Sequence, residues 1–224
     1  MSVRTNLEEI YNKIKHACQK VNRDPSEIMI IGVTKYVTIE RAEEAIKAGI
    51  TNLGENRTEE LTEKYNQLSD EVKWHFIGTL QSRKVRDVID KVKAIHSLDR
   101  LSIAKQINNR SKDPIDCFVQ VNVSGEESKH GLTPEDVIPF IEELKEYKKV
   151  RVVGLMTMAP HIEDEDKLRQ VFKSLAQLRD RVQGNHFEHA PCKFLSMGMS
   201  NDYEIAIEEG ATHIRIGSKL VGTE

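Results

Sequence analysis

A lysine that follows a buried strand can act as a nucleophile toward carbonyl groups. Lys35 comes directly after the run Ile28–Thr34, whose residues are almost all apolar or glycine. Such a run is typical of a parallel-sheet strand buried on both faces, so we expect Lys35 at the floor of a pocket. Burial there would lower the pKa of the ammonium and leave a free amine that condenses with an aldehyde or ketone. A lysine that simply extends from the strand end into solvent is the alternative interpretation.

Two loops near the other end of the chain carry small and hydroxylated residues that suit an anion. The segment 196–202 and the pair Gly217 and Ser218 each follow a strand-like run. Backbone N–H groups and hydroxyls would face a negative charge there, and Ser200 or Asn201 would cap the helix that follows. Either loop alone is typical of a simple turn. Together, at the ends of the last two strands of a barrel, they match a known arrangement for binding phosphate.

The elements that must position these groups alternate along the chain. Apolar runs predict strands near residues 28–34, 50–53, 73–77, 93–97, 115–123, 150–155, 193–196 and 212–216. Helix patterns lie near residues 3–22, 39–48, 56–69, 81–91, 99–111, 134–147, 165–183 and 201–209. This alternation favours an α/β fold, a single (β/α)8 TIM barrel with an extra N-terminal helix, over an open doubly wound sheet. Because no full helix pattern follows the last strand, we expect the helix over 3–22 to cover that gap.

Composition narrows the class of protein. The 224 residues can bury one substantial core, and no linker-like segment divides them, so we expect one domain over residues 1–224. A net charge of −3 gives no reason to expect nucleic acid or an anionic membrane as a partner. No apolar stretch has the length of a membrane span or of a signal-peptide core. Three distant cysteines, at 18, 117 and 192, do not suggest disulfides, so we expect a cytoplasmic protein.

Several strings of residues resemble the signatures of the pyridoxal phosphate homeostasis protein family. In chain order they are Val33-Thr34-Lys35, Gly54-Glu55-Asn56, Trp74 to Gly78, Gly154-Leu155-Met156, Ser196 to Ser200 and Arg215-Ile216-Gly217. The resemblance implies a barrel similar to the N-terminal domain of bacterial alanine racemase, which binds pyridoxal 5'-phosphate (PLP) as a Schiff base. It implies a role in vitamin B6 homeostasis as a carrier or buffer without turnover, hence no catalytic residues. PLP-dependent apoenzymes are then the expected partners, and we expect a monomer.

The same resemblance assigns roles to individual residues. Lys35 is similar to the lysine that forms the Schiff base, and Arg215 to the partner of the pyridine nitrogen. Because a guanidinium stays protonated, the ring nitrogen that it faces stays unprotonated and the ring is a poor electron sink. This arrangement suits holding the cofactor, although alanine racemase also has an arginine there. The residues that resemble phosphate ligands are Ser200, Gly217, Ser218 and, as a weaker candidate, Ser196.

Two polar residues near the predicted strand ends have open roles. In a barrel, the amide of Asn56 would reach the same face as Lys35, where contact with the cofactor's ring hydroxyl and capping of the next helix both remain open. His75 lies between Trp74 and Phe76 in the predicted strand, so its side chain faces the opposite side of the sheet from theirs. A core histidine bonded to its neighbours is preferred there over an acid–base role.

Two enzymatic alternatives remain. A PLP-dependent amino-acid racemase of alanine-racemase type needs a second base across the cofactor from Lys35, and Tyr36, next to that lysine, should point the opposite way. A Schiff-base aldolase acting on a sugar phosphate would use the same amine, but no distinct acid–base pair is evident near it.

Two further groups of residues carry less weight. His186, His189 and Cys192 have a spacing that suits a metal, but they lie in a loop without an evident carboxylate partner, so no metal is expected. The loop 124–131 should overhang the barrel mouth. Its Lys129 is either a second amine for cofactor exchange or part of a flexible charged loop.

Overall fold

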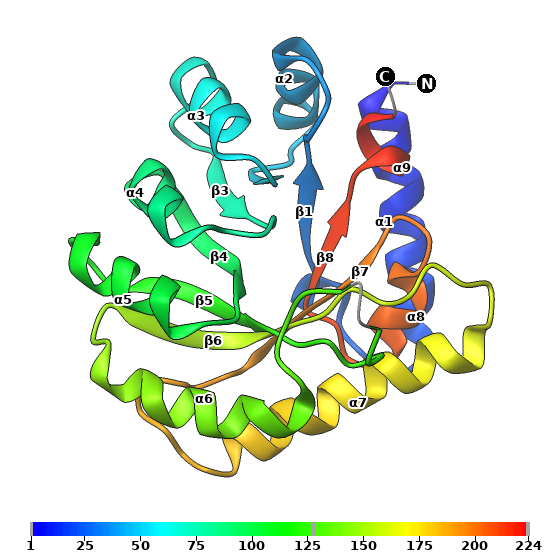
Figure 1. Ribbon diagram of the computed structural model, residues 1–224. Helices are drawn as coiled ribbons and strands as arrows, with labels where there is room; N and C mark the ends of the chain where they lie inside the picture. The colour runs from blue at the N-terminus through cyan, green and yellow to red at the C-terminus, as the bar shows by residue number, and fades with distance from the viewer. Residues whose placement is uncertain (1, 127–128, 223–224) are drawn as a thin grey trace.

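The computed structural model describes residues 2–126 and 129–222. Over these ranges the chain forms eight parallel strands that close into a barrel, in which each strand pairs with the next in sequence and β8 pairs with β1 (Figure 1). The predicted (β/α)8 barrel is confirmed, and each predicted strand is present near its expected position. The strands are β1 (Met29–Val33), β2 (Asn52–Glu55), β3 (Lys73–Phe76), β4 (Val92–Leu98), β5 (Ile115–Gln120), β6 (Val150–Met156), β7 (Phe194–Met199) and β8 (His213–Ile216).

Helices cover the outside of this barrel. In the described ranges they are α1 (Val3–Lys20), α2 (Ile39–Lys47), α3 (Thr58–Gln67), α4 (Val85–Val88), α5 (Leu101–Arg110), α6 (Val137–Glu143), α7 (Glu165–Gln183), α8 (Tyr203–Glu208) and α9 (Ser218–Val221). Two predicted helices, over 81–91 and 134–147, are shorter because 3-10 turns replace their ends. These 3-10 turns lie at Ser82–Lys84, Pro134–Asp136 and Leu144–Glu146, and another lies at Pro25–Glu27.

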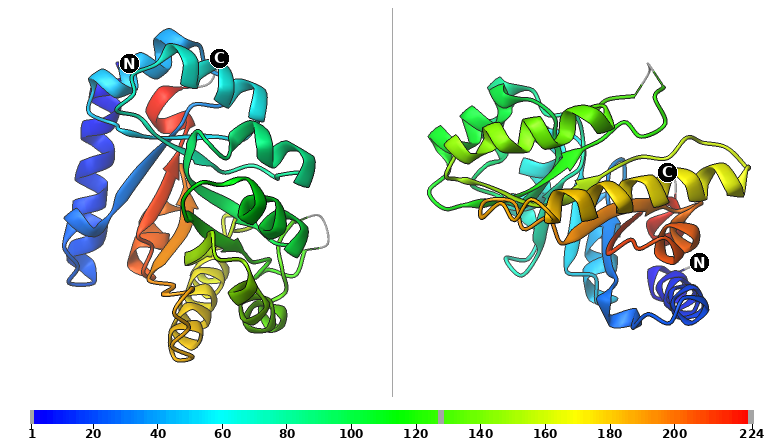
Figure 2. Two further views of the ribbon diagram at one scale, coloured as in Figure 1. Left: turned by 90° about the vertical axis from the view of Figure 1, so that its left-hand side faces the viewer. Right: turned by 90° about the horizontal axis from the view of Figure 1, so that it is seen from below.

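The N-terminal helix completes the outer layer beside the last strand. α1 packs against α8, α9 and α2, which sets the first and last elements of the chain side by side (Figures 1 and 2). The side-chain amide of Asn6 donates a hydrogen bond to the carbonyl of Leu220 in α9, at 2.9 Å. The prediction that this helix covers the gap after the last strand is therefore confirmed. Val21, inside the predicted range 3–22, follows the helix end and is exposed.

The barrel interior holds a group of aromatic and imidazole rings. The His96 ring stacks on Phe118 with 4.2 Å between centroids, and Phe118 meets the edge of His213 from across the barrel at 5.1 Å. His75 lies 2.9 Å from His96, measured between Nδ1 and Nε2. It is buried and bonded to its neighbours, while Trp74 alternates with it along β3 and packs in the main hydrophobic core. The prediction of a core histidine is confirmed.

The structure also describes the surroundings of the residues with metal-like spacing, of the cysteines and of the loop 124–131. His189 bonds the carbonyl of Ile141, and no three His, Cys, Asp or Glu side chains gather as a metal site within the described residues. Cys18, Cys117 and Cys192 are free and buried. No helix in the described ranges is long and apolar enough to cross a membrane. In the loop 124–131, residues 127 and 128 lie outside the described residues, and Lys129 pairs with Glu126.

Candidate functional site

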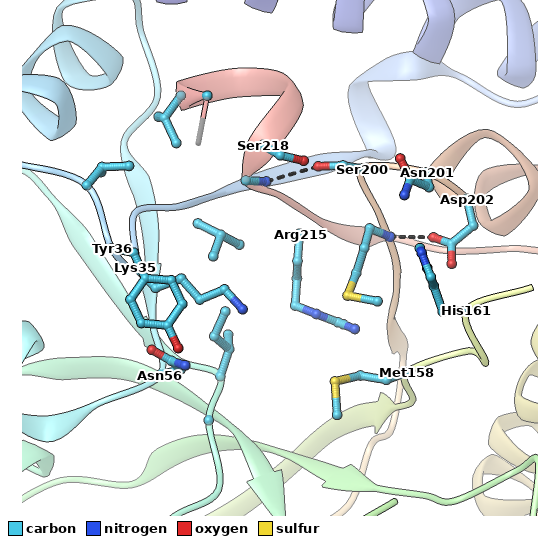
Figure 3. Close-up of a pocket in the computed structure, with 18 of the residues that line it drawn as sticks. Lys35, Tyr36, Asn56, Met158, His161, Ser200, Asn201, Asp202, Arg215 and Ser218 are labelled. Carbon is cyan, nitrogen blue, oxygen red and sulfur yellow. Dashed lines mark hydrogen bonds between the residues drawn. The ribbon is translucent and has the colours of Figure 1, made fainter. Parts of the chain in front are cut away.

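A cavity of about 530 Å³ opens at the C-terminal ends of the strands, the end where barrels of this kind carry their sites (Figure 3). Its walls come from the C-terminal ends of β1, β5, β7 and β8 and from the segments that follow β1, β2, β3, β6, β7 and β8. All predicted site residues except Ser196 line this cavity, namely Lys35, Asn56, Ser200, Arg215, Gly217 and Ser218. The structure therefore brings together residues that are up to 183 positions apart in the sequence (218 − 35).

Lys35 extends into the cavity from the loop after β1 (Figure 3). The residue is exposed, so the expectation of a lysine buried at the floor of a pocket is wrong. The strand ends at Val33 and burial ends with Thr34, which leaves Lys35 at the mouth. Its Nζ lies 5.6 Å from the centre of the Tyr36 ring and has no hydrogen bond or ion pair within the part of the chain that is described. The amine is thus accessible to a ligand.

The backbone before Lys35 is fixed by a buried group that we call the ionic cluster, formed by Thr34, Glu55 and Lys64. The Nζ of Lys64 lies 2.7 Å from Oε1 of Glu55 and also donates to the carbonyl oxygen of Thr34. The Thr34 hydroxyl donates to the same Glu55 oxygen at 2.7 Å. Burial raises the pKa of Glu55, although Lys64 and Thr34 oppose this shift. Sequence reasoning missed Lys64, which lies on α3 far from any loop signal.

Asn56 presents an unsatisfied acceptor next to the cavity. Its Oδ1 is buried and has no hydrogen-bond partner among the described residues. Capping of the next helix is wrong as an interpretation, because the N-cap of α3 is Arg57 and no side chain caps it. Gly78 packs so closely that a Cβ there would lie 2.2 Å from the Asn56 carbonyl oxygen. Because Asn56 also lines the cavity, this oxygen is available to a ligand that donates a hydrogen bond.

Arg215 is a buried cation on the cavity wall. Its residue is 4% exposed, and burial lowers the pKa of the guanidinium to about 10. Nη1 donates to Oγ of Ser196 at 2.6 Å, and Nη2 donates to the carbonyl oxygen of Thr157 at 2.9 Å. None of the ion pairs among the described residues involves this arginine. With neutral partners on one side, its remaining N–H groups are available to a ligand.

Ser196 lies beneath Arg215 rather than on the cavity wall. It is fully buried, and its Oγ lies 2.8 Å from Nδ1 of His96 as well as accepting from Arg215. The predicted phosphate contact is therefore corrected, because this hydroxyl is used in holding the arginine. The predicted strand over 193–196 ends at Ser196, whereas β7 continues to Met199, so this serine lies inside the strand and not in the loop after it.

The loops after β7 and β8 are joined by Ser200. Its Oγ accepts from the backbone N–H of Gly217 at 3.3 Å (Figure 3) and from that of Lys219 at 3.5 Å. Neither Ser200 nor Asn201 caps the next helix, so that prediction is wrong. The N-cap of α8 is Asp202, whose Oδ1 accepts from the N–H of Met199 at 2.6 Å. Hydroxyls and amides of two loops thus meet at one side of the cavity.

Sequence reasoning also missed part of the cavity wall. Tyr36 lines the cavity beside Lys35 instead of pointing the opposite way. Its φ of 64° lies in the left-handed region, so the strand alternation used for the prediction does not continue to this residue. Its ring also lies 5.2 Å from the guanidinium carbon of Arg57. Met158 and His161, from the segment after β6, complete the opposite wall without a sequence signal.

The fold and the site define a single barrel of the alanine racemase N-terminal type. The family model described as "Alanine racemase, N-terminal domain" matches residues 5–224. The chain is 41% identical over 220 residues to the pyridoxal phosphate homeostasis protein of Aquifex aeolicus, with 96% of each chain covered. This chain belongs to the pyridoxal phosphate homeostasis protein family.

Solved structures agree with this assignment. A protein of unknown function from Bifidobacterium adolescentis superimposes with a TM-score of 0.93 at 30% identity, over 98% of this chain and 94% of that one. PipY of Synechococcus elongatus, solved with PLP bound, gives a TM-score of 0.81 at 27% identity, over 94% of this chain and 100% of that one.

Proposed function

We propose that this protein binds PLP in the barrel-mouth cavity and takes part in PLP homeostasis as a carrier or buffer without turnover. The observation that carries the proposal is the convergence of an unpaired amine, a buried guanidinium and a pair of joined hydroxyl-rich loops in one cavity. The names of the relatives and the PLP-bound state of PipY support the same ligand.

The cavity residues match the functional groups of PLP. When bound, this cofactor supplies an aldehyde that reacts with primary amines. Lys35 would provide the amine that condenses with that aldehyde, and Arg215 would donate a hydrogen bond to the pyridine nitrogen. The unsatisfied amide oxygen of Asn56 accepts from the ring hydroxyl. The phosphate is bound through hydroxyls and backbone N–H groups of Ser200, Gly217 and Ser218.

Two features support holding the cofactor rather than turnover. Arg215 stays protonated near neutral pH even with its pKa lowered to about 10, so a pyridine nitrogen held against it would stay unprotonated. An unprotonated ring is a weak electron sink, which disfavours carbanion chemistry. Lys35 is exposed, so an amine of another protein can approach the link and take the cofactor. PLP-dependent apoenzymes are the proposed acceptors of the cofactor. We propose that the protein acts as a monomer. Its free cysteine thiols support a cytoplasmic location.

The second candidate is a PLP-dependent amino-acid racemase of alanine-racemase type. Tyr36 favours it, because this phenol lines the cavity that holds Lys35. Racemisation needs acid–base groups on opposite faces of the substrate carbon, whereas Tyr36 lies directly against the lysine. An assay of the interconversion of L- and D-alanine distinguishes the two functions. Turnover that is lost in both Lys35→Ala and Tyr36→Phe would establish the racemase and overturn the carrier.

A spectrophotometric titration with PLP tests the binding itself. The wild-type protein is expected to give a saturable visible band at one equivalent of PLP, and Lys35→Ala is expected to give none.

The transfer of PLP from this protein to an apoenzyme is tested by following the recovery of the apoenzyme's activity. Recovery of apoenzyme activity should be faster with the loaded protein than with the same amount of free PLP, and equal rates would contradict direct transfer.

A further inference from the structure

A continuous line of side chains, buried except for a partly exposed Asn52 at its start, runs through the barrel interior and ends at Arg215. We call it the histidine chain, formed by Asn52, His75, His96 and Ser196. Oδ1 of Asn52 lies 3.1 Å from Nε2 of His75, whose Nδ1 lies 2.9 Å from Nε2 of His96. Nδ1 of His96 lies 2.8 Å from the Ser196 hydroxyl, which accepts from Arg215 at 2.6 Å. The chain thus connects the start of β2 with the cavity wall.

One arrangement of protons satisfies every link of this chain. A guanidinium is a donor only, so Ser196 accepts from Arg215 and donates its own proton to Nδ1 of His96. His96 then carries its proton on Nε2 and donates to His75. His75 carries its proton on Nε2 and donates to the Asn52 carbonyl oxygen. Each histidine is neutral, and the direction deduced from Arg215 agrees with an amide oxygen as the last acceptor.

Burial keeps the two imidazoles in this state. His75 is 3% exposed and His96 is fully buried. Desolvation lowers the pKa of His75 to about 3 and the pKa of His96 well below its ordinary value. The stacking of His96 on Phe118 fixes the plane of its ring. A protonated His96 would present an N–H to each neighbour and would break the sequence of donors and acceptors.

We propose that Ser196, His96 and His75 are positioning residues that hold Arg215 in the orientation needed for the pyridine nitrogen of PLP. This inference rests on the proposed function. A carboxylate in the place of Ser196 would neutralise the guanidinium, whereas the neutral chain orients it and leaves its charge for the ligand. Ser196 and the carbonyl of Thr157 each take one N–H, which leaves the other donors of the guanidinium for the cavity.

The protein offers a matched pair of serine variants for the test. Ser196→Ala removes the hydroxyl that joins Arg215 to His96. Ser97→Ala removes a second buried serine hydroxyl, 2% exposed, on β4, and this hydroxyl has no hydrogen-bond partner among the described residues. Both substitutions delete one oxygen from the barrel, so a general effect on packing would appear in both. The readouts are the Kd for PLP and the absorption spectrum of the bound cofactor, followed as a function of pH.

Ser196→Ala is expected to weaken PLP binding about tenfold, the usual effect of losing a hydrogen bond to a charged group. It should also change the absorption maximum or its pH dependence, because the donor at the pyridine nitrogen is displaced. Ser97→Ala should match the wild type in both measurements. Equal Kd values and spectra for Ser196→Ala and the wild type would overturn the inference while leaving PLP binding intact. A wild-type protein that binds no PLP would overturn the proposed function and this inference with it.

A second pair of variants decides the question if Ser196→Ala does not fold. His96→Gln keeps an acceptor for Ser196 and a donor for His75, whereas His96→Leu keeps neither. The inference predicts a spectrum near that of the wild type for His96→Gln and a shifted spectrum for His96→Leu. Identical spectra for the two variants would contradict it.

Discussion

The two cationic residues of the cavity stand on buried supports of opposite character. Beneath Lys35, the ionic cluster pairs a carboxylate and an ammonium whose side chains are 0% and 6% exposed. Beneath Arg215, the histidine chain consists of neutral groups, and its acceptor for the guanidinium is a serine hydroxyl. The ionic cluster bonds the backbone of Thr34, next to the lysine, and the Lys35 side chain has no hydrogen-bonding or ionic partner among the described residues. The histidine chain instead bonds the Arg215 side chain itself.

This difference matches the tasks proposed for the two cations. A lysine that exchanges a covalent partner needs an amine without competing bonds, so its position is fixed through the backbone. An arginine that donates to one ring atom needs a fixed guanidinium whose charge is not neutralised nearby. The same cavity therefore combines an exposed, reactive lysine, Lys35, with a buried arginine of fixed orientation, Arg215.

Breaking the ionic cluster should have the largest effect on stability. Lys64→Met leaves Glu55 buried without its cation, and removal of one partner from a buried pair costs about 3 to 5 kcal/mol. Lys47→Met is the control, because Lys47 and Glu43 form an ion pair on the surface of α2. That variant should lose less than about 1 kcal/mol in urea unfolding. Equal losses for the two variants would show that the ionic cluster does not support the β1 end of the barrel.

The buried histidines of the barrel interior, namely His75 and His96 of the histidine chain and the nearby His213, should make stability depend on pH. The pKa values of His75 and His213 are lowered by burial to about 3 and about 4, from an ordinary value of 6.5. The unfolded chain therefore binds more protons between about pH 4 and 6.5, and the free energy of unfolding falls as the pH falls through this window. Each buried histidine contributes about 1.4 kcal/mol per pH unit. Urea unfolding at several pH values measures the slope.

A variant in the histidine chain provides the control for this dependence of the free energy of unfolding on pH. His96→Gln removes one proton-binding group from the unfolded state, so its stability should fall less steeply with decreasing pH than that of the wild type. A stability that is unchanged between pH 7 and pH 5 would contradict neutral, buried histidines.

The smallest effect concerns the backbone at Tyr36. Its φ of 64° is costly for any residue with a Cβ, so Tyr36→Gly should be more stable than Tyr36→Ala by about 1 kcal/mol. Tyr65 is the control, in the last turn of α3, where the helical backbone should make alanine more favourable than glycine. Thermal unfolding of the four variants gives the comparison. The same order at both positions would argue against strain in the loop after β1.

The sequence predicted the scaffold and most of the cavity wall because both follow from local patterns. Apolar runs set the positions of the strands, and the loops after parallel strands meet at one end of a barrel, which brings Lys35 and Ser200 together. The family strings then supplied the roles of these residues. Both kinds of inference depend on residues that are adjacent in the sequence or recur at fixed spacing.

The missed features depend on depth and on pairing across the barrel. The predicted first strand extends one residue past the observed end at Val33, and this difference underlies the wrong expectation that Lys35 is buried. The alternation of a strand shows which side Ser196 faces but not that it lies below the cavity wall. Lys64 is an ordinary helical lysine in sequence, and its buried partner becomes visible only in three dimensions.

The most direct test of the account is to map where PLP attaches. The purified protein is mixed with one equivalent of PLP, reduced with borohydride, digested and analysed by mass spectrometry, with Lys35→Ala treated in the same way. We expect one pyridoxyl adduct, on Lys35, and no adduct at one equivalent in the variant. An adduct spread over surface lysines, or one that persists in Lys35→Ala, would contradict the proposal that this barrel holds PLP through Lys35.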